Sequence, residues 1–307
     1  MDTKLFGRNQ PGGMFSIVDR EFFPGSIFWV GSAVSGASDS AGYGRNPDAP
    51  FATIDYAVGK CTASAGDVIF VLPGHTEDLA TATACAVDVA GVSIIGLGSG
   101  RLMPTLSTTA AAGCVAISAA NVTIKNIKLL ANFATGTTNM MTLSTAADGC
   151  TLDGLKFRDT SATNEALVHI AVATTVTDLV IRGCSFVTAA GSMTGSVVFA
   201  GSSTDCVIED SVWYVDSSDS VIDHQTTAAV NILLRRNAVV NVDDGAAGYC
   251  VELKTGSTGI AQDNRFGYGK VDAEVAVGDA VWWFENYASN TIAESGLLDP
   301  STSHAIP

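Results

Sequence analysis

The sequence predicts an all-β protein whose chain winds into a parallel β-helix, a solenoid of stacked coils. Three observations lead to this fold class. The 307 residues are rich in Val, Ser, Thr and Gly and include only 8 Pro, a composition that favours short strands and turns over long helices. A nine-residue pattern recurs at a nearly constant period. At one position of this pattern, charged residues alternate in sign.

The repeat is visible in the segments "NVTIKNIKL", "GCTLDGLKF" and "DLVIRGCSF". A fixed period of this kind is the signature of a repeat architecture. Positions are counted from the second residue of each quoted segment, so that Val122, Cys150 and Leu179 stand first. The apolar third position is then occupied by Ile94, Ile124, Leu152, Ile181, Ile208, Leu234 and Ala261. Subtracting successive residue numbers gives steps of 30, 28, 29, 27, 26 and 27 residues. About seven coils of this length fit a β-solenoid in which each coil pairs with the next.

Each coil is predicted to contain three strands. The first, third, sixth and eighth positions of the pattern are mostly apolar, so two strands of period two are joined by a bend at the fourth and fifth positions. Most residues at the fifth position tolerate the backbone conformations of a corner. They are Gly96, Asn126, Gly154, Gly183, Asp210, Arg236 and Asp263. The third strand follows in segments such as "CVAIS", "MMTLS", "LVHIA" and "CVELK".

Two further positions support this register. The fourth position carries the alternating charges, in what we call the charge ladder: Lys125, Asp153, Arg182, Glu209 and Arg235. Alternation is expected if these side chains point outward and stack as neighbours, because opposite charges attract and like charges destabilise. The eighth position predicts an internal stack of large apolar groups, formed by Leu129, Phe157, Phe186, Trp213, Val239 and Phe266.

The two ends of the solenoid need covers, because an unpaired strand edge invites association. In "NPDAPFATIDYAVGKC", helical spacing relates Phe51, Ile54, Val58 and Cys61. Asp48 and Pro50 supply start signals for this capping helix. The segment "GDVIFVLPGHTEDL" then reads as an initial strand and turn. We therefore predict an N-terminal arm over 1–45, the β-helix with its cap helix over 46–270, and a C-terminal cap or tail over 271–307.

Two segments give a resemblance to a known fold family. "GYGRNPDAPFATIDYAV" and "AGDVIFVLPGHTE" resemble the opening of right-handed parallel β-helix proteins of the pectin-lyase-like kind, and the likeness extends to about residue 270. It implies right-handed coils, in agreement with the general hand of parallel crossovers. The flanks "LFGRNQPGGMFSIVDREFFPGSIFWVGS" and "VWWFENYASNTIAESGLLDPS" are similar to segments of virion structural proteins in tailed bacteriophages. This second likeness implies a capsid-decorating or head-associated particle component.

The first 45 residues place many aromatic side chains where no repeat would bury them. Because chain termini are ordered only when they are tied down, we expect these residues either to bind partner chains or to fold back along their own coils. The candidate partner-binding residues are Phe6, Phe15, Phe22, Phe23, Phe28 and Trp29. The resemblance implies a homotrimer that binds the major capsid protein or other virion proteins, in a virion assembled in the host cytoplasm.

Charge and cysteine content exclude several function classes. The chain has 31 acidic and 16 basic residues and a formal net charge of −15, a field that repels phosphate backbones and anionic membranes. No apolar run approaches the length of a membrane span or of a signal peptide core. The seven cysteines lack CxxC pairs, so buried free thiols are expected in place of a disulfide framework or metal site. We expect no cofactor.

Pectin-lyase-like folds often cleave polysaccharides, and one region has the residues that such chemistry would need. Glycoside hydrolysis uses two carboxylates that face each other about 5 to 9.5 Å apart. The richest set is Asp216, Asp219, Asp223, His224, Asp243 and Asp244, in the corners and strands of adjacent coils. Acidic residues also gather at solvated turns for ordinary reasons, and the polygalacturonase-type motifs that the resemblance would require are absent. We therefore expect no catalytic residues and no enzymatic activity.

The remaining candidates for chemistry have structural explanations. A lyase would need a catalytic Arg, and the available Arg182 and Arg235 are better explained by the charge ladder. His169, in "LVHIA", is expected either at the surface beside an inward pair or as a satisfied core residue, and the other histidines form no HxH or HExxH spacing. Together with these explanations, the resemblance of the flanks implies a non-enzymatic phage virion protein that decorates the capsid through its arm. The alternative is a tailspike or receptor-binding protein that binds or depolymerises surface polysaccharide, so surface glycans remain a further class of partner.

Overall fold

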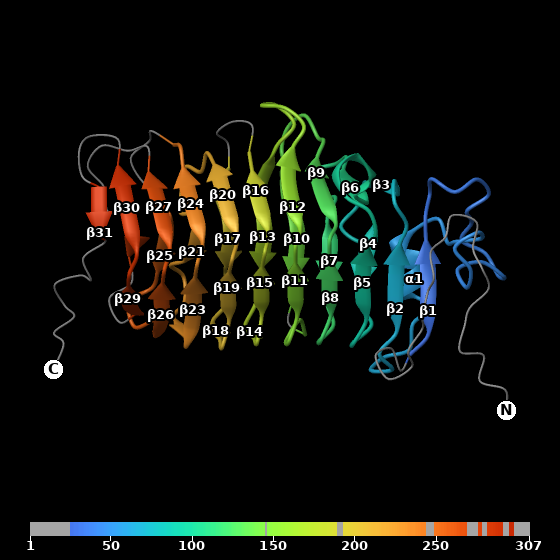
Figure 1. Ribbon diagram of the computed structural model, residues 1–307, viewed down its shortest axis with the longest axis horizontal. Coiled ribbons are helices and arrows are strands. Elements are labelled where there is room, and N and C mark those ends of the chain that lie inside the picture. Colours follow the sequence, from blue (N-terminus) through green and yellow to red (C-terminus); the bar gives the residue numbers. More distant parts are fainter. Residues whose placement is uncertain are drawn as a thin grey trace.

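The computed structural model describes residues 25–144, 146–188, 193–243, 249–268, 276–277, 281–290 and 295–297. It confirms the all-β, right-handed parallel β-helix, with strands stacked in rows along one long axis (Figure 1). The seven predicted coils are present, and further strands extend the stack at both ends. Within the described residues, helix is limited to α1 (Ile54–Val58) and the 3-10 turn η1 (Gly100–Leu102). Three long sheets form the sides of the solenoid.

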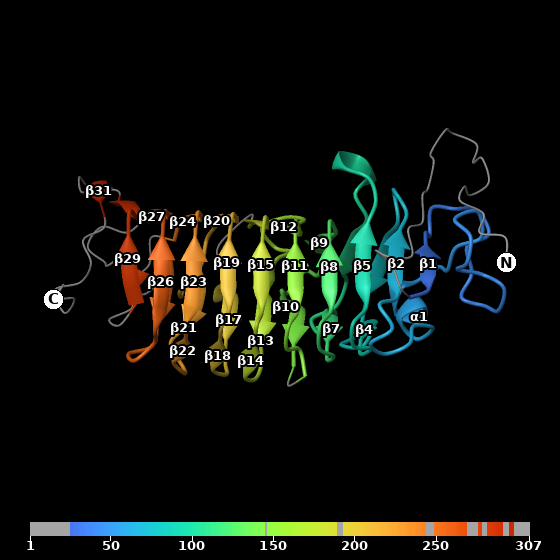
Figure 2. The same ribbon diagram turned by 60° about the horizontal axis from the view of Figure 1, so that its bottom comes forward.

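Sheet 1 contains the first strand of every predicted coil and faces the viewer in Figure 2. Its strands pair in parallel and in register, so that Ile124, Leu152 and Ile181 stack as predicted. In spatial order the strands are β1 (Ile27–Val30), β2 (Val68–Val71), β5 (Ser93–Gly96), β8 (Thr123–Lys125), β11 (Thr151–Asp153), β15 (Val180–Arg182), β19 (Val207–Glu209), β23 (Ile232–Arg235), β26 (Gly259–Gln262) and β29 (Val281–Phe284).

Sheet 2 follows sheet 1 after the predicted bend and ends in an antiparallel strand. The last strand, β31, reverses direction and pairs with β30. The order is β3 (Thr76–Leu79), β6 (Thr105–Thr108), β9 (Lys128–Ala131), β12 (Lys156–Asp159), β16 (Ser185–Val187), β20 (Val212–Val215), β24 (Ala238–Asn241), β27 (Arg265–Tyr268), β30 (Tyr287–Asn290) and β31 (Ser295–Leu297).

Sheet 3 contains the third strand of each coil and lies at the back in Figure 1. Its order is β4 (Cys85–Val87), β7 (Val115–Ile117), β10 (Thr137–Leu143), β13 (Ala166–Val172), β17 (Gly195–Phe199), β21 (Ile222–His224), β25 (Val251–Leu253) and β28 (Ala276–Val277). A small sheet at the next corner contains β14 (Val176–Thr177), β18 (Ser203–Thr204) and β22 (Ala229–Val230). From there the chain returns to sheet 1.

The charge ladder has the predicted geometry on the outside of sheet 1. Asp153 forms ion pairs with both neighbours. Its Oδ2 lies 3.0 Å from Lys125 Nζ and 3.1 Å from Arg182 Nη2. Arg235 pairs with Glu209 one coil further on. Because each pair joins residues about 27 residues apart in sequence but adjacent in the sheet, these contacts confirm the coil-to-coil register.

The bend between sheets 1 and 2 uses left-handed backbone at the predicted fifth position. Gly154 and Gly183 have φ angles of 65° and 60°, which glycine adopts without steric cost. Asp210 and Arg236 adopt the same conformation at 51° and 52°, where a Cβ is strained. The two side chains compensate with paired 2.7 Å hydrogen bonds from the Arg236 guanidinium to Asp210.

The interior contains the predicted apolar stack. The Phe157 and Phe186 rings lie 4.7 Å apart with planes 8° apart, and the Phe186 and Trp213 rings repeat that spacing at 4°. His169 lies beside this stack, fully buried, and its Nδ1 is 2.8 Å from Ser196 Oγ. Its Nε2 has no partner among the described residues. Of the two placements expected for His169, the structure therefore selects the core, with one of its two ring nitrogens unpaired.

Buried asparagines occupy the sixth position in the later coils, where the pattern predicts apolar side chains. Asn237, Asn264 and Asn286 form an asparagine ladder, in which each side-chain oxygen accepts a backbone N–H from the preceding coil. Their amide nitrogens donate to the carbonyls of Ile208, Leu234 and Ala261 at 2.8 to 2.9 Å. This ladder satisfies the buried backbone groups of the bend.

The N-terminal end is closed as predicted, though by a shorter helix. Thr53 caps α1 by accepting a hydrogen bond from Tyr56 N–H, and Ile54 and Val58 are buried. The strand β1, which lies inside the predicted arm, pairs with β2 and completes sheet 1. Phe28 in this strand is 1% exposed in the core. At the other end, β29 and β30 carry sheets 1 and 2 beyond residue 270.

All seven cysteines are free thiols, as the sequence predicts, and six of them are buried. Burial raises the pKa of Cys184 and Cys250 to about 12, which keeps both thiols protonated. The cysteines therefore act as small apolar core residues. Of the helices within the described residues, none has the length and apolarity that crossing a bilayer requires.

Candidate functional site

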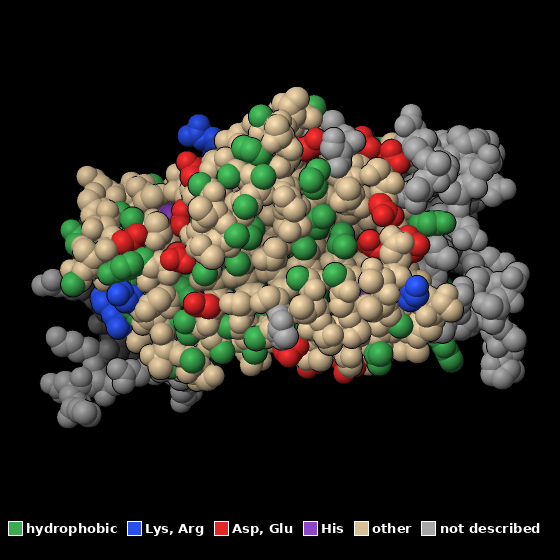
Figure 3. All heavy atoms as spheres, turned by 180° about the vertical axis from the view of Figure 1, so that it is seen from behind, with side chains coloured by type: hydrophobic (Ala, Val, Ile, Leu, Met, Phe, Trp, Pro, Cys, Tyr) green, Lys and Arg blue, Asp and Glu red, His purple; other side chains and the backbone are tan. Residues whose placement is uncertain are grey.

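The outer face of sheet 3 carries the side chains of greatest chemical interest (Figure 3). One outward position of each strand aligns in register from coil to coil. This outer row consists of Ala86, Ala116, Thr142, Ala171, Val198, Asp223 and Glu252. The row is small and uncharged over its first five members and acidic at the last two. From Thr142 to Glu252 it spans four steps, or roughly 19 Å.

An open pocket lies at the uncharged part of this face. It has a volume of about 280 Å³ and is lined by Ala82, Ala111, Ala112, Cys114, Thr138, Asn139 and Thr142. The small side chains leave space, while Asn139 and the two threonines offer hydrogen-bonding groups. Such a surface can contact both the apolar faces and the hydroxyl groups of a sugar.

Three carboxylates come together at the other part of the face, and we call them the acidic cluster: Asp219, Asp223 and Glu252. Asp223 and Glu252 occupy opposed positions on β21 and β25. Gln225 connects Asp223 to Asp219, because its Nε2 lies 3.4 Å from a carboxylate oxygen of each. Ser220 donates a 2.6 Å hydrogen bond to Glu252 Oε2.

The sequence around β21 explains why a carboxylate is held here. Ile222 and His224 point inward, so the alternation of the strand sends Asp223 to the outer face. The His224 ring stacks on Phe199 at 4.6 Å, and its Nε2 lies 2.8 Å from Ser203 Oγ. His224 thus anchors the strand from inside the core. It is a structural neighbour of the cluster and has no access to the outer face.

The environment of the cluster raises the pKa of two of its carboxyl groups. Burial raises the pKa of Asp223, and the Asp219 carboxylate adds to the increase, while hydrogen bonds from Gln225 oppose it. Burial also raises the pKa of Glu252, as do the charges of Asp223 and Asp219. General acids in enzymes are often carboxyl groups whose pKa is raised by burial and by neighbouring carboxylates.

The structure brings together only part of the acidic set that the sequence singled out. Asp219 and Asp223 join the cluster, whereas Asp216 and Asp243 make backbone contacts with other partners, Thr188 and Asn241 respectively. Asp244 lies outside the described residues. Glu252 was missed, because its segment "CVELK" was read only as a third strand. The signal that finds it is the register of sheet 3, which aligns it with Asp223.

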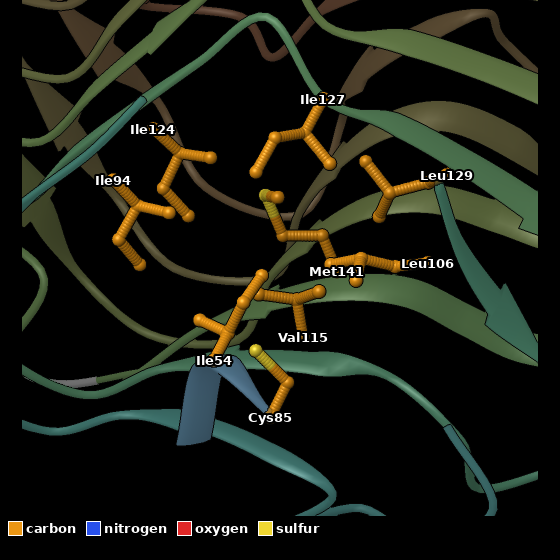
Figure 4. A pocket seen from close by; sticks show the side chains of 9 residues that line it. All are labelled: Ile54, Cys85, Ile94, Leu106, Val115, Ile124, Ile127, Leu129 and Met141. Atoms are coloured by element: carbon orange, nitrogen blue, oxygen red, sulfur yellow. The ribbon is translucent and has the colours of Figure 1, made fainter. Parts of the chain in front are cut away.

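A second cavity lies inside the solenoid and has no functional character. Figure 4 shows nine side chains pointing into it, all built from carbon and sulfur: Ile54, Cys85, Ile94, Leu106, Val115, Ile124, Ile127, Leu129 and Met141. Its volume is about 10 Å³. A water molecule needs polar partners, so this space is a packing defect beneath the N-terminal cap.

The arm residues predicted to bind partners are only partly placed. Phe6, Phe15, Phe22 and Phe23 lie outside the described residues. The Phe28 ring is buried in the chain's own core, where Arg45 lies 4.3 Å from the ring centre. Trp29 packs against Phe70 at 5.1 Å within sheet 1. For these two residues the structure favours the alternative that the segment folds onto its own coils.

Comparison with known proteins identifies the fold. No family model matches the chain, and no curated protein matches its sequence. Among solved structures, a rhamnogalacturonan lyase matches with a TM-score of 0.52 and 14% identity over 86% of this chain and 74% of that one. The chain has a pectin-lyase-like β-helix fold. At this identity the likeness shows the fold alone.

Two further β-helix matches have lower TM-scores. A GH136 lacto-N-biosidase from Eubacterium ramulus matches at 0.41 with 9% identity, over 86% of this chain and 67% of that one. A pectin methylesterase from Aspergillus niger, in deglycosylated form, matches at 0.38 with 14% identity, over 91% and 94%.

The comparison with solved structures corrects the prediction about enzymatic activity. We expected no enzymatic activity, and that exclusion is wrong, since the structure with the TM-score of 0.52 is a polysaccharide lyase. Activity has to be argued from this chain's own side chains, of which the acidic cluster is the candidate. Within the described ranges, no group of three or more His, Cys, Asp or Glu side chains is arranged to hold a metal ion.

Proposed function

We propose that the chain is a polysaccharide-acting β-helix protein, which binds a glycan along the outer face of sheet 3 and hydrolyses it at the acidic cluster. The observation that carries the proposal is the meeting of Asp219, Asp223 and Glu252 at one end of an uncharged row with an open pocket. An elongated ligand lying along the row would contact the pocket and the cluster together.

The three carboxylates can be given separate roles. Glu252 is the general acid, which would give a proton to the departing glycosidic oxygen, because burial and the charges of Asp223 and Asp219 shift its pKa upward, in the direction that this role requires. Asp219 is the second carboxylate, held by hydrogen bonds from Ser220 N–H and the Gln225 amide. Hydrolysis needs one carboxyl group of each kind. Asp223 is 8% exposed and acts as a positioning residue, whose charge raises the pKa of Glu252.

The test is cleavage of polysaccharides by the purified full chain. New reducing ends and falling viscosity are measured across a panel of plant, bacterial and capsular polymers. Glu252→Gln and Asp219→Asn should each lower the rate by at least about a hundredfold, while their thermal stability stays close to wild type. Asp88→Asn, which changes an exposed acid elsewhere, is the matched control and should leave the rate unchanged.

Two results would overturn this proposal. If no polymer is bound or cleaved, the proposed function fails as a whole. If a polymer is cleaved equally well by wild type, Glu252→Gln and Asp219→Asn, the activity belongs to another site. Both variants replace a carboxylate by an amide of the same shape, so a loss of activity with retained folding reports on chemistry.

A finer proposal concerns where this activity is located. From the resemblance of the flanking segments alone, we propose that the chain is a virion component of a tailed phage, active against host surface polysaccharide as a tailspike or receptor-binding protein. A homotrimer and binding to other virion proteins remain predictions of the same kind. Immunogold labelling of intact particles would test the location, and labelling over the capsid in place of the tail tip would contradict it.

A further inference from the structure

Charge is unevenly distributed around the solenoid. We consider sheet 3 and the segments that enter it from sheet 2. Among their described residues up to β25 there is no Lys and no Arg. The same set contains six acidic residues: Glu165, Asp216, Asp219, Asp223, Asp243 and Glu252. Figure 3 shows the result, with acidic side chains across this face and no basic side chain in its middle.

The basic residues of the coils lie on the other two sides. Those in sheets 1 and 2 and in the segments that connect sheet 1 to sheet 2 are Arg101, Lys125, Lys128, Lys156, Arg158, Arg182, Arg235, Arg236 and Arg265. Three of them, Lys125, Arg182 and Arg235, are already engaged in the charge ladder. Lys254 is the basic residue nearest to sheet 3 in sequence, and it follows β25 on the side that leads back to sheet 1.

This distribution restricts the polymers that the face can hold. A uronan or sulfated glycan carries regularly repeated negative charges. Laid along the outer row, it would bring several of them within a Debye length, about 8 to 10 Å, of the acidic cluster. Charges of like sign repel, more strongly near a low-dielectric surface than in water. Among the described residues, Lys254 is the one basic side chain beside the cluster: it is exposed and lies two residues after Glu252, so strand alternation places it on the same outer face. One cation against six acidic residues leaves the face negative.

An uncharged polysaccharide meets the same surface without this penalty. Its hydroxyl groups can donate to the carboxylates of the acidic cluster and bond to Thr142 and Asn139 at the pocket. The apolar faces of its rings can pack on the small side chains of the row, Ala116, Ala171 and Val198. Hydrogen bonds from neutral donors to carboxylates are among the stronger ones in proteins.

Building on the proposed function, we infer that the substrate is an uncharged polysaccharide and that polyanionic glycans are excluded. The side chains on the outer face of sheet 3 decide against that class. Specificity here comes from repulsion of the wrong partner as well as attraction of the right one.

The experiment compares binding of uncharged and anionic polymers by affinity electrophoresis and calorimetry. Full-length Glu252→Gln is used so that the polymer is not consumed, with wild type alongside. The probes are galactomannan, mannan and dextran as uncharged polymers, and polygalacturonate and alginate as uronans. At low salt we expect at least one uncharged polymer to bind with little salt dependence, and the uronans to bind at least about tenfold more weakly.

Two single substitutions give the inference a second readout. Val198→Lys adds a cation to the outer row, and should raise polygalacturonate affinity at low salt by roughly tenfold. Val207→Lys makes the same change at an outward position of sheet 1, and should leave that affinity unchanged. Because both sites are partly exposed valines in strands, effects on folding are matched.

The possible results separate this inference from the proposed function. Binding of polygalacturonate as tight as, or tighter than, that of every uncharged polymer at low salt overturns the inference and leaves the proposed function standing. An equal response to Val198→Lys and Val207→Lys also counts against it, since the outer row would then not be the binding surface. Absence of binding to any polymer defeats the proposed function itself.

Discussion

Asp223 and Glu252 face each other on neighbouring strands of sheet 3, and the charge of Asp223 raises the pKa of Glu252 beyond the increase due to burial. The two carboxylates receive different donors: Gln225 donates to Asp223, and Ser220 donates to Glu252. This pairing couples one buried carboxylate to a more exposed one. Several measurable consequences depend on it.

Removing the charge of Asp223 should change the pH dependence of polysaccharide hydrolysis. In Asp223→Asn, the pKa of Glu252 falls toward its ordinary value, because one of the charges that raises it is gone. Glu252 then loses its proton at lower pH, and the alkaline limb of the kcat/KM profile moves to lower pH. Profiles of wild type, Asp223→Asn and the control Asp88→Asn test this. If the alkaline limb does not move in Asp223→Asn, the charge of Asp223 does not influence the pKa of the general acid.

The same carboxylates should affect stability in a pH-dependent way. The folded-state pKa of Asp223 is raised above its ordinary 3.8, so between these two values the folded state binds more protons than the unfolded state. Stability therefore falls as the pH rises through that window. Asp223→Asn removes this loss, and its Tm should exceed that of wild type more at neutral pH than near pH 3.8. A Tm difference that does not depend on pH would contradict the assignment.

His169 should produce the opposite pH dependence. Burial lowers its pKa to about 3, with a contribution from Arg158, so an unfolded chain takes up a proton below about pH 6.5 that the folded chain refuses. Stability is thus lost as the pH falls from 6.5 toward 3. Met140 occupies the corresponding place in the preceding coil, and His169→Met should flatten this part of the Tm profile. A profile as steep as that of wild type would show that His169 does not titrate in this way.

Reversing one member of the charge ladder should destabilise the solenoid. Arg182→Glu would put three negative charges in a row with Asp153 and Glu209, at a cost of roughly 0.5–1 kcal/mol at low salt that high salt removes. Lys128→Glu is the matched control, because Lys128 opposes Lys156 in sheet 2 and its reversal replaces repulsion by attraction. Urea unfolding at two salt concentrations measures both. Equal effects of the two reversals would contradict the register.

Interrupting the asparagine ladder should lower the free energy of unfolding more than a typical surface substitution does. Asn264→Ala removes the acceptor for Asn237 N–H and the donor to Leu234 C=O, and both groups stay buried. Leaving buried polar groups unpaired costs about 1–3 kcal/mol each, so a loss of roughly 2–5 kcal/mol is expected. Asn264→Asp keeps the acceptor but loses the donor and buries a carboxylate beside the Leu234 carbonyl, so it should be destabilised as well. Chemical denaturation of the three proteins measures both losses, and a neutral Asn264→Ala would refute the prediction.

The sequence predicted sheets 1 and 2 well because their coils stack in register with little change in length. In these sheets, each side chain meets its counterpart one coil away, so apolar positions such as Phe157 and Phe186 and charged ones such as Asp153 and Arg182 repeat visibly along the chain. The asparagine ladder was missed because its sixth position is apolar in the early coils, as at Ile127 and Leu155, and the pattern was generalised from those.

Sheet 3 could not be placed with the same accuracy, since variable segments precede each of its strands. From Val198 to Asp223 the chain advances 25 residues, and from Asp223 to Glu252 it advances 29, although both pairs are neighbours in the sheet. No constant period therefore connects Glu252 to Asp223. The burial of Phe28 was missed for a different reason, because β1 belongs to sheet 1 without carrying the nine-residue pattern.

The register that sheets 1 and 2 share has a further consequence for the outer row of sheet 3. Every coil contributes one residue to that row, and the contacts between coils are repeated from each coil to the next. Inserting or deleting a complete coil would change the length of the row by about 4.8 Å while leaving the corner and ladder contacts of the remaining coils intact. The length of the proposed binding face is therefore set by the number of complete coils.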